Sequence, residues 1–156
     1  MRNFLAAMTG LVCILLAGLT GGATGIEVRM AIGPAVELVA DWDIGWKWHL
    51  ALSAGVHLGM DPQTPSATIQ TPSLMFATHV RYTPLGTQQP VVPYVGLAAA
   101  IRTASGTLTG FVRPCAGLRA RVTPNLYLLA EGGRLIPLIR PEKRRWDLTV
   151  GVGLRF

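Results

Sequence analysis

The stretch "WDLTVGVGLRF", residues 146–156, decides the fold of this chain. Every second residue in it is large and apolar, and the residues between are small, polar or charged. The apolar set is Trp146, Leu148, Val150, Val152, Leu154 and Phe156. A period of two places one set of side chains on each face of a β-strand. The stretch therefore predicts a strand with one apolar face and a second face of glycine and charge.

The same period of two organises most of the chain. In "SLMFATHVRY", residues 73–82, the apolar residues Leu74, Phe76 and Val80 fall on one face. Turn signals such as "PLGTQQP" and "TPN" separate the runs. Residues 26–42 alternate throughout and fit one long strand or two short ones. Gly33 and Pro34 favour two, because proline lacks the donor for the ladder, and this count gives eight strands in all.

The second face of these strands is a poor surface for water, because it consists mainly of glycine, alanine, arginine and a few acids. In lipid the arrangement inverts: apolar side chains face outward and the polar set lines a narrow interior. Backbone groups in lipid must all be hydrogen-bonded, so strands there must close on themselves. The predicted fold is an all-β, closed, antiparallel eight-stranded transmembrane β-barrel over residues 26–156. A secreted soluble β-sandwich or lipid carrier is the alternative fold.

Aromatic residues gather near the expected strand ends. Trp42, Trp46, Trp48, Tyr82 and Phe156 fall near one set of ends, beside short connections, and Trp146 falls at the opposite end. Such rings prefer the two interfaces of a bilayer. Their positions favour the membrane reading over the soluble one.

Residues 1–25 have the layout of a secretory signal peptide. A single charge at Arg2 precedes an apolar run over residues 11–19, and small residues follow. The run is too short to span a membrane. We expect export and cleavage after Ala23 or Gly25, with an uncleaved N-terminal anchor as the alternative.

Charge and cysteine content exclude several classes. The chain carries a formal net charge of +6, from 14 Lys+Arg and 8 Asp+Glu, and loss of Arg2 leaves 13 against 8, or +5. The arginines are spread singly through apolar segments, unlike the clustered face of a nucleic-acid-binding protein. Beyond the signal only Cys115 remains, so no internal disulfide or multi-cysteine metal site can form. His49 and His57 would lie about 26 Å apart on one strand, so neither a metal nor a cofactor is predicted.

The terminal strand resembles that of bacterial outer-membrane β-barrel proteins, which end in an aromatic residue preceded by alternating apolar residues. The resemblance implies that the barrel-assembly machinery reads an assembly signal made of Val150, Val152, Leu154 and Phe156. "RVTPNLYLLAE", residues 121–131, is similar to the short periplasmic turns of the small eight-stranded members of that class. The outer membrane of a Gram-negative bacterium is the location that this implies, and we expect a monomer there.

The inward face is expected to carry a network of charged residues. Its members are Glu27, Arg29, Glu37, Arg81, Arg102, Arg113, Arg119, Arg121, Glu131, Asp147 and Arg155. An eight-stranded barrel is just wide enough for side chains to fill, and charges there must pair because burying a lone charge is costly. The sequence therefore favours an ion-paired lumen that is plugged, rather than a porin-like conducting pore. In a conducting lumen the surplus of arginine would favour anions.

Ser53 and His79 are the weak candidates for catalysis. A hairpin that bends near Ser66 would bring them together on the inward face, where a histidine could activate the hydroxyl. A cross-strand hydrogen bond without chemistry is the simpler interpretation.

Two stretches, "ELVADWDIGWKW" and "SLMFATHVRY", resemble the lipid A 3-O-deacylases, which are eight-stranded barrels of the same membrane. That family has a His-x-Ser pair on its penultimate strand. The corresponding stretch here, "YLLAEGGRLIPL", contains neither residue, so the activity is not carried over. A lipid-modifying hydrolase with an unlocated site stays an alternative.

The last long connection, "LIRPEKRRW", gathers basic residues where the chain should emerge outside. Arg140, Lys143, Arg144 and Arg145 stand there against Glu142 alone. The outer leaflet is lipopolysaccharide, whose phosphates suit arginine. The sequence predicts a barrel without enzymatic activity that supports the cell envelope, with this cluster either binding those phosphates or forming a solvated loop.

Overall fold

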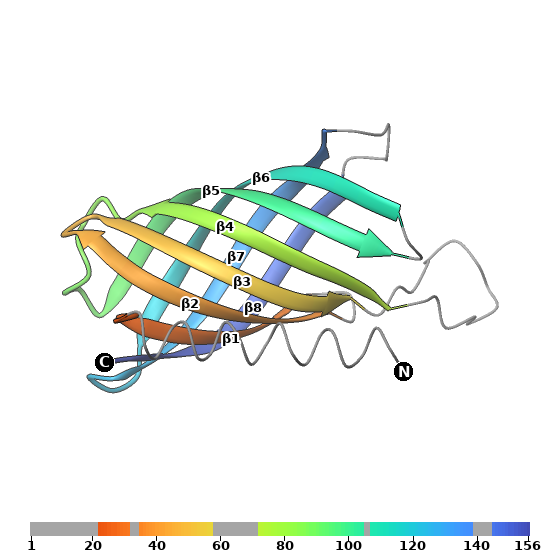
Figure 1. Ribbon diagram of the computed structural model, residues 1–156. Coiled ribbons are helices and arrows are strands. Elements are labelled where there is room, and N and C mark those ends of the chain that lie inside the picture. The colour runs from red at the N-terminus through yellow and green to blue at the C-terminus, as the bar shows by residue number, and fades with distance from the viewer. Residues whose placement is uncertain (1–21, 32–34, 58–71, 105–106, 139–144) are drawn as a thin grey trace.

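The computed structural model describes residues 22–31, 35–57, 72–104, 107–138 and 145–156 (Figure 1). Eight antiparallel strands close into one barrel, in which each strand pairs with its neighbours in sequence and the last pairs with the first. The strands are β1 (Gly25–Ala31), β2 (Ala35–Gly45), β3 (Trp48–His57), β4 (Ser73–Tyr82), β5 (Val91–Ala104), β6 (Thr107–Arg121), β7 (Leu126–Pro137) and β8 (Arg145–Arg155). The predicted fold class is confirmed.

Residues 26–42 form two strands, as the sequence favoured, because β1 ends at Ala31 and β2 begins at Ala35. The two pair in continuous register from Gly25 opposite Asp41 to Ala31 opposite Ala35. The expected turn residues Gly33 and Pro34 lie outside the described residues. The signal-peptide prediction also falls mainly outside them, since the description begins at residue 22.

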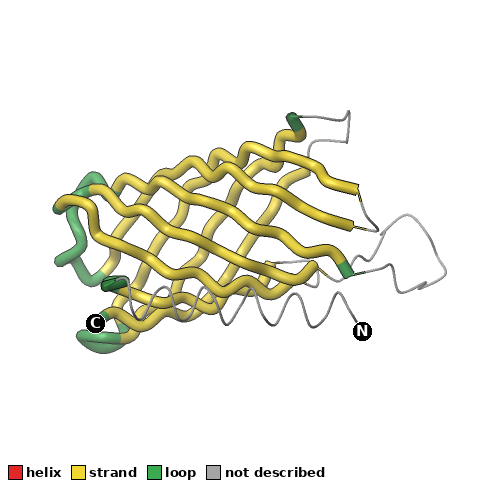
Figure 2. The backbone as a smooth tube through the Cα atoms, in the orientation of Figure 1, coloured by secondary structure: helices red, strands yellow, loops and turns green. Residues whose placement is uncertain are grey.

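The barrel has two distinguishable ends (Figures 1 and 2). At one end, here called the turn end, β2 joins β3, β4 joins β5, β6 joins β7, and the chain terminates. At the opposite end, here called the loop end, β1, β3, β5 and β7 finish and β2, β4, β6 and β8 begin. Trp46, Trp48 and Phe156 stand exposed at the turn end and Trp146 at the loop end, as the sequence predicted. Among the described residues no helix is long and apolar enough to span a membrane.

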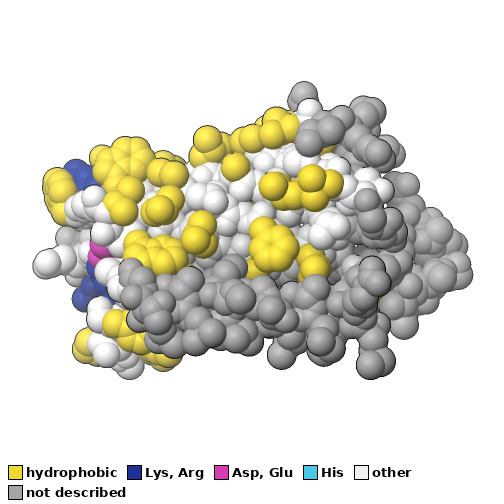
Figure 3. Space-filling view, in the orientation of Figure 1, with side chains coloured by type: hydrophobic (Ala, Val, Ile, Leu, Met, Phe, Trp, Pro, Cys, Tyr) yellow, Lys and Arg dark blue, Asp and Glu magenta, His cyan; other side chains and the backbone are white. Residues whose placement is uncertain are grey.

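Apolar side chains cover the outward face of the strands. Half or more of the side-chain surface is exposed at Val95, Leu97 and Ile101 of β5, whereas Ala98 and Ala100 between them are buried. In the space-filling view, hydrophobic side chains spread along the barrel wall and the visible charged groups gather near the turn end (Figure 3). Continuous exposed apolar surface of this kind suits hydrocarbon, not water.

The interior contains two kinds of side chain, an apolar cluster and a set of buried charged groups. Near the loop end a small apolar cluster of Met75, Ala77, Ala100 and Phe111 packs with Leu135. The middle of the barrel is occupied instead by fully buried charged side chains, including Glu27, Arg29 and Arg81 at 0% exposure. These buried charged side chains are the candidate functional residues of the barrel.

Candidate functional site

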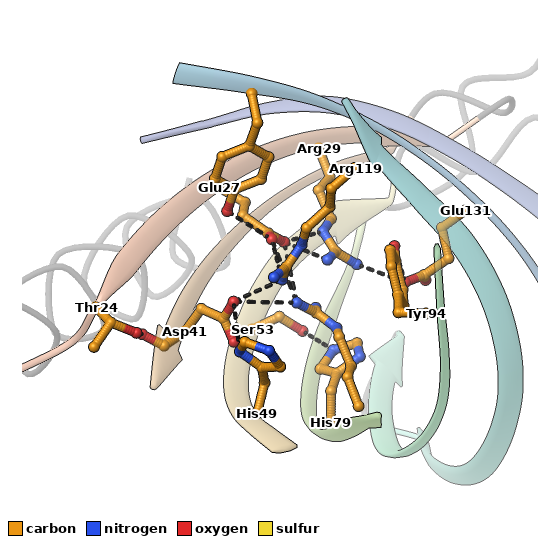
Figure 4. A network of polar contacts seen from close by, with 12 residues as sticks. Thr24, Glu27, Arg29, Asp41, His49, Ser53, His79, Tyr94, Arg119 and Glu131 are labelled. Carbon is orange, nitrogen blue, oxygen red and sulfur yellow. Dashed lines mark hydrogen bonds and ion pairs between the residues drawn. The ribbon is translucent and has the colours of Figure 1, made fainter. Parts of the chain in front are cut away.

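Glu27 on β1 is the centre of the buried network (Figure 4). Its Oε1 accepts hydrogen bonds from Arg119 Nη2 at 2.7 Å and from the Tyr127 hydroxyl at 2.9 Å. Its Oε2 accepts from Arg29 Nε at 2.7 Å, and Arg81 Nη1 lies 3.3 Å from Oε1. The donors come from β1, β4, β6 and β7, so one carboxylate ties together strands around the whole wall.

Glu131 on β7 forms a second centre nearer the loop end. Its Oε2 accepts a hydrogen bond from the Tyr94 hydroxyl at 2.8 Å and lies 3.3 Å from Arg29 Nη1. Its Oε1 pairs with Arg113 Nη1. Arg113 Nε in turn lies 2.9 Å from Asp147 Oδ2. Arg29 contacts both Glu27 and Glu131, so the two centres form one network.

The network continues toward the turn end through Asp41 of β2. Asp41 Oδ2 accepts a hydrogen bond from Arg119 Nη2 at 2.6 Å. The neighbouring inward residue on β2, Asp43, lies 2.7 Å from His49 Nδ1 and pairs with Arg155. Asp43 and Arg155 are about one-third exposed, so this last pair lies at the rim and not in the sealed interior.

Among the described residues, the buried ion pairs join equal numbers of positive and negative groups. Four guanidinium groups meet four carboxylates, and these are Arg29, Arg81, Arg113 and Arg119 with Glu27, Asp41, Glu131 and Asp147. Removal of any one carboxylate would leave buried positive charge uncompensated, which is far more costly than losing an exposed ion pair.

Glycine on the inward face makes room for the tyrosines of the network. A Cβ on Gly117 would lie 2.6 Å from Tyr94 Cζ and 2.6 Å from the Ala130 carbonyl oxygen, closer than real Cβ contacts. A Cβ on Gly153 would overlap the ring of Tyr127. Of the two glycines that alternate with apolar residues in β8, Gly153 makes room for the Tyr127 ring and Gly151 makes room for the backbone of the neighbouring strand at Val28.

Two separate cavities flank the network. The cavity at the turn end is lined by Asp41, Asp43, Arg119, Arg121, Tyr127 and Arg155, among others. The cavity at the loop end is lined by Glu37, His57, Met75, His79, Arg113 and Asp147, among others. No residue lines both, and Glu27, Arg29 and Arg81 lie between them without lining either. The charged network therefore separates the two cavities.

Most of the expected inward set meets in this network, and some of it does not. Those brought together are Glu27, Arg29, Arg81, Arg113, Arg119, Glu131 and Asp147. Arg121 instead is exposed at the last position of β6 and donates to the Thr87 carbonyl oxygen at 2.7 Å. Arg155 occupies the rim pair with Asp43. Both arginines lie at the turn-end mouth of the lumen, where they line the cavity there, and not among the fully buried charges.

Glu37 and Arg102 lie toward the loop end, outside the contacts of Glu27 and Glu131. Glu37 packs beside Gly55, where an added Cβ would lie 2.6 Å from its Cγ. Arg102 places Cζ 4.9 Å from the centroid of the Phe111 ring. The expected surplus of arginine on the inward face stays a prediction, because these two residues lie outside the ion pairs centred on Glu27 and Glu131.

Several members of the site were absent from the sequence-based set, among them Asp41, Asp43, His49, Tyr94 and Tyr127. Asp41 shares the inward parity of Glu37 on one strand, and that parity is the signal that could have found it. The tyrosines carry a weaker signal, because an aromatic residue near a strand end also fits a membrane interface. Arg119 Cζ lies 5.4 Å from the Tyr94 ring centroid and 5.3 Å from that of Tyr127, so it is held between the rings.

Ser53 and His79 do meet. Ser53 Oγ lies 2.9 Å from His79 Nε2, across the β3–β4 ladder in which Ser53 opposes Ala77. Both side chains are 2% exposed. Within the described residues His79 Nδ1 has no hydrogen-bond partner, so the acid that would orient a catalytic base is not seen there. The geometry supports a structural hydrogen bond over nucleophilic chemistry.

The other expected sites divide between described and undescribed residues. The basic cluster residues Arg140, Lys143 and Arg144 lie outside the described residues, and Arg145 begins β8 opposite Leu135. The predicted assembly signal Val150, Val152, Leu154 and Phe156 lies on the outward face of β8, with Phe156 N donating to the Thr24 carbonyl oxygen at 3.0 Å. In the part of the chain that the structure describes, no group of three or more His, Cys, Asp or Glu is placed to hold a metal ion.

Similar folds occur among solved structures. The N-terminal β-barrel domain of Pseudomonas aeruginosa OprF matches with a TM-score of 0.66 at 18% identity, covering 86% of this chain and 98% of that one. Neisserial surface protein A matches with a TM-score of 0.58 at 18% identity, covering 85% of this chain and 94% of that one. No protein-family model and no curated protein matches the sequence. At this low sequence identity the structural matches establish a shared fold alone, and the function must be argued from the site.

Proposed function

We propose that this protein is an integral outer-membrane β-barrel that supports the cell envelope and whose lumen is closed by the charged network. The outward apolar surface supports insertion in lipid, and the fold shared with outer-membrane barrels supports the choice of membrane. One observation carries the closed lumen: Glu27 gathers guanidinium and hydroxyl groups from four strands across the interior of the barrel. The separation of the two cavities agrees with it.

Ion efflux from lipid vesicles tests the closed lumen. The full chain is reconstituted into vesicles loaded with chloride, alongside protein-free vesicles and vesicles that contain an open porin. We expect the rate of efflux to equal that of protein-free vesicles. Steady efflux, or a stable single-channel conductance in a planar bilayer, would show an open path and contradict the proposal.

Export through a cleaved signal peptide is part of the same proposal. Of the two expected cleavage positions, the one after Ala23 is favoured by the contacts of Thr24. Its N–H donates to the Asp41 carbonyl oxygen at 2.8 Å, and its own carbonyl oxygen accepts from Phe156 N. The mass of protein extracted from outer-membrane fractions is expected to correspond to a chain that begins at Thr24. A mass that retains residues 1–23 would contradict cleavage.

We infer that the barrel-assembly machinery reads the C-terminal strand. Phe156 is exposed at the turn end, next to the outward residues Leu154 and Val152. Replacement Phe156→Ala is expected to lower the amount of folded protein in the outer membrane of cells while leaving folding into lipid vesicles in vitro unchanged. Phe76→Ala, an outward aromatic within β4, is the matched control. Equal membrane levels of both variants would remove the support for an assembly signal.

The basic cluster Arg140, Lys143, Arg144 and Arg145 is proposed to bind phosphates of lipopolysaccharide. Its support is the chemistry of the sequence and its position in the connection between β7 and β8 at the loop end. Replacement of the four by glutamine is expected to reduce the lipopolysaccharide that co-purifies with the protein. Co-purification at the wild-type level would leave only the solvated-loop interpretation.

A further inference from the structure

Arg134 is the exception on the outward face of the barrel. Alternation and register place it with Leu128 and Ala130 of β7, opposite in parity to buried Leu129 and Glu131. Among the strand residues that the structure describes, it is the only charged residue with outward parity. A lone charge on a lipid-facing surface is costly near the middle of a bilayer, so its place on the strand matters.

The position of Arg134 is close to the loop end. It pairs with Trp146 in the second-last pair of the β7–β8 ladder, before Leu135 opposite Arg145. Its Cζ lies 5.8 Å from the centroid of the Trp146 ring, which is itself 80% exposed. Tryptophan prefers the headgroup level of a bilayer, and the cost of an outward arginine falls to about 0–1 kcal/mol there. The pair therefore suits the level at which lipid headgroups begin.

Among the described residues, no carboxylate pairs with Arg134. Its contact there is with the Trp146 ring. On the same outward face, two residues along β7, Gly132 has open space where a side chain would stand. The guanidinium thus has an aromatic support on one side and free surface beside it.

From these contacts we propose that Arg134 and Trp146 form an outward-facing clasp for a phosphate of a lipopolysaccharide molecule in the outer leaflet. Guanidinium groups bind phosphate through paired N–H donors, and the ring restricts the arginine to one orientation. The inference rests on the proposed function in one respect, that the loop end faces outward. It differs from the basic connection 139–144 because the contact lies on the barrel wall, beside the lipid.

Titration of lipid A onto the detergent-solubilised full chain, followed by native mass spectrometry, tests the clasp. The probes are bisphosphorylated lipid A, the fully dephosphorylated lipid and phosphatidylglycerol. Arg134→Gln is expected to weaken binding of bisphosphorylated lipid A about tenfold, the effect of losing a charged hydrogen bond. Arg134→Lys keeps the positive charge but lacks the paired N–H donors of a guanidinium, and it is expected to lose less affinity for this lipid. Arg121→Gln, an exposed arginine at the turn end, is the matched control and is expected to bind as wild type.

The outcomes separate this inference from the proposed loop site. If Arg134→Gln loses affinity and the fourfold loop variant does not, the clasp stands and the loop proposal fails. If the loop variant alone loses affinity, the clasp is wrong. Equal binding of dephosphorylated lipid or of phosphatidylglycerol by the wild type would also overturn it. Heat-modifiable migration on a gel, measured for each variant, shows that it is folded.

Discussion

The inward and outward faces of the same strands handle charge in opposite ways. Along β7, inward Glu131 is 1% exposed and is contacted by Arg29, Arg113 and Tyr94. Three positions away, outward Arg134 contacts a tryptophan ring and no carboxylate among the described residues. Inside, charge is tolerated because each group has partners. Outside, it is tolerated only where the strand approaches the bilayer surface.

The difference shows that partners and depth, not charge alone, decide where a membrane strand accepts an ionised side chain. The inward face needs opposite charges from distant strands to meet at one level. The outward face needs apolar residues through the membrane core and admits charge near its edge. Each face can be disturbed separately, and the expected effects differ in size.

Removal of the carboxylate of Glu27 is expected to have the largest effect. Glu27→Gln leaves Arg29, Arg81 and Arg119 with uncompensated buried charge, and the free energy of unfolding should fall by about 3–5 kcal/mol. Denaturant titration in lipid vesicles measures it. Glu37→Gln, on the neighbouring strand and outside the contacts of Glu27 and Glu131, is the control with the same chemistry. Equal losses for the two variants would show that Glu27 has no special position.

A charge placed on the outward face at mid-membrane should be the next most costly change. Leu97 lies in the middle of β5 and is 54% exposed, so Leu97→Arg should lower the free energy of unfolding by about 2–4 kcal/mol. Val91→Arg, at the turn-end start of the same strand, should cost about 0–1 kcal/mol. The same titration compares them. A loss that does not depend on depth would mean that this face is not in lipid.

Filling the space over an inward glycine should have an intermediate effect. Gly117→Ala would press on Tyr94 and on the backbone at Ala130, and overpacking of this kind costs about 1–3 kcal/mol. Gly132→Ala, on the outward face with nothing within 4 Å, is the matched control and should be nearly neutral. If both variants kept wild-type stability, the lumen could not be as tightly filled as described.

The rim pair should matter least. Arg155→Gln breaks a contact with Asp43 that is about one-third exposed on both sides, and exposed ion pairs contribute about 0–1 kcal/mol. The free energy of unfolding should change by less than about 1 kcal/mol, and the small difference should shrink in high salt. A loss as large as that for Glu27→Gln would show that the rim is part of the sealed network.

Much of the fold could be predicted from the sequence, because the face on which a strand side chain lies follows from its position along that strand alone. A period of two separated Leu97 from Ala98 and Phe76 from Ala77 without knowledge of any distant residue. Closure followed from the backbone's need for partners in lipid. The strand count depended on the turn signal that Gly33 and Pro34 give in the sequence.

The composition of the site was less accessible, because it depends on how strands are staggered around the barrel. Parity places Glu27, Arg81 and Arg119 inside, but only the register brings residues from β1, β4 and β6 to one level. Ser53 and His79 illustrate the same limit, since their contact required the register across residues 58–71. Tyr94 and Tyr127 were missed because the sequence does not distinguish a tyrosine whose hydroxyl binds a buried carboxylate from one at a membrane interface.

The central claim is that hydrocarbon covers the outward face of the strands, and spin labels test it most directly. A label is attached to cysteine at Leu97 or at Leu85, which lies in the β4–β5 turn, in a chain whose Cys13 and Cys115 are replaced by alanine and which is folded into lipid vesicles. We expect the Leu97 label to collide with oxygen dissolved in lipid and to be shielded from a water-soluble nickel complex, and we expect the reverse for the Leu85 label. Equal access of the nickel complex to both labels would contradict it.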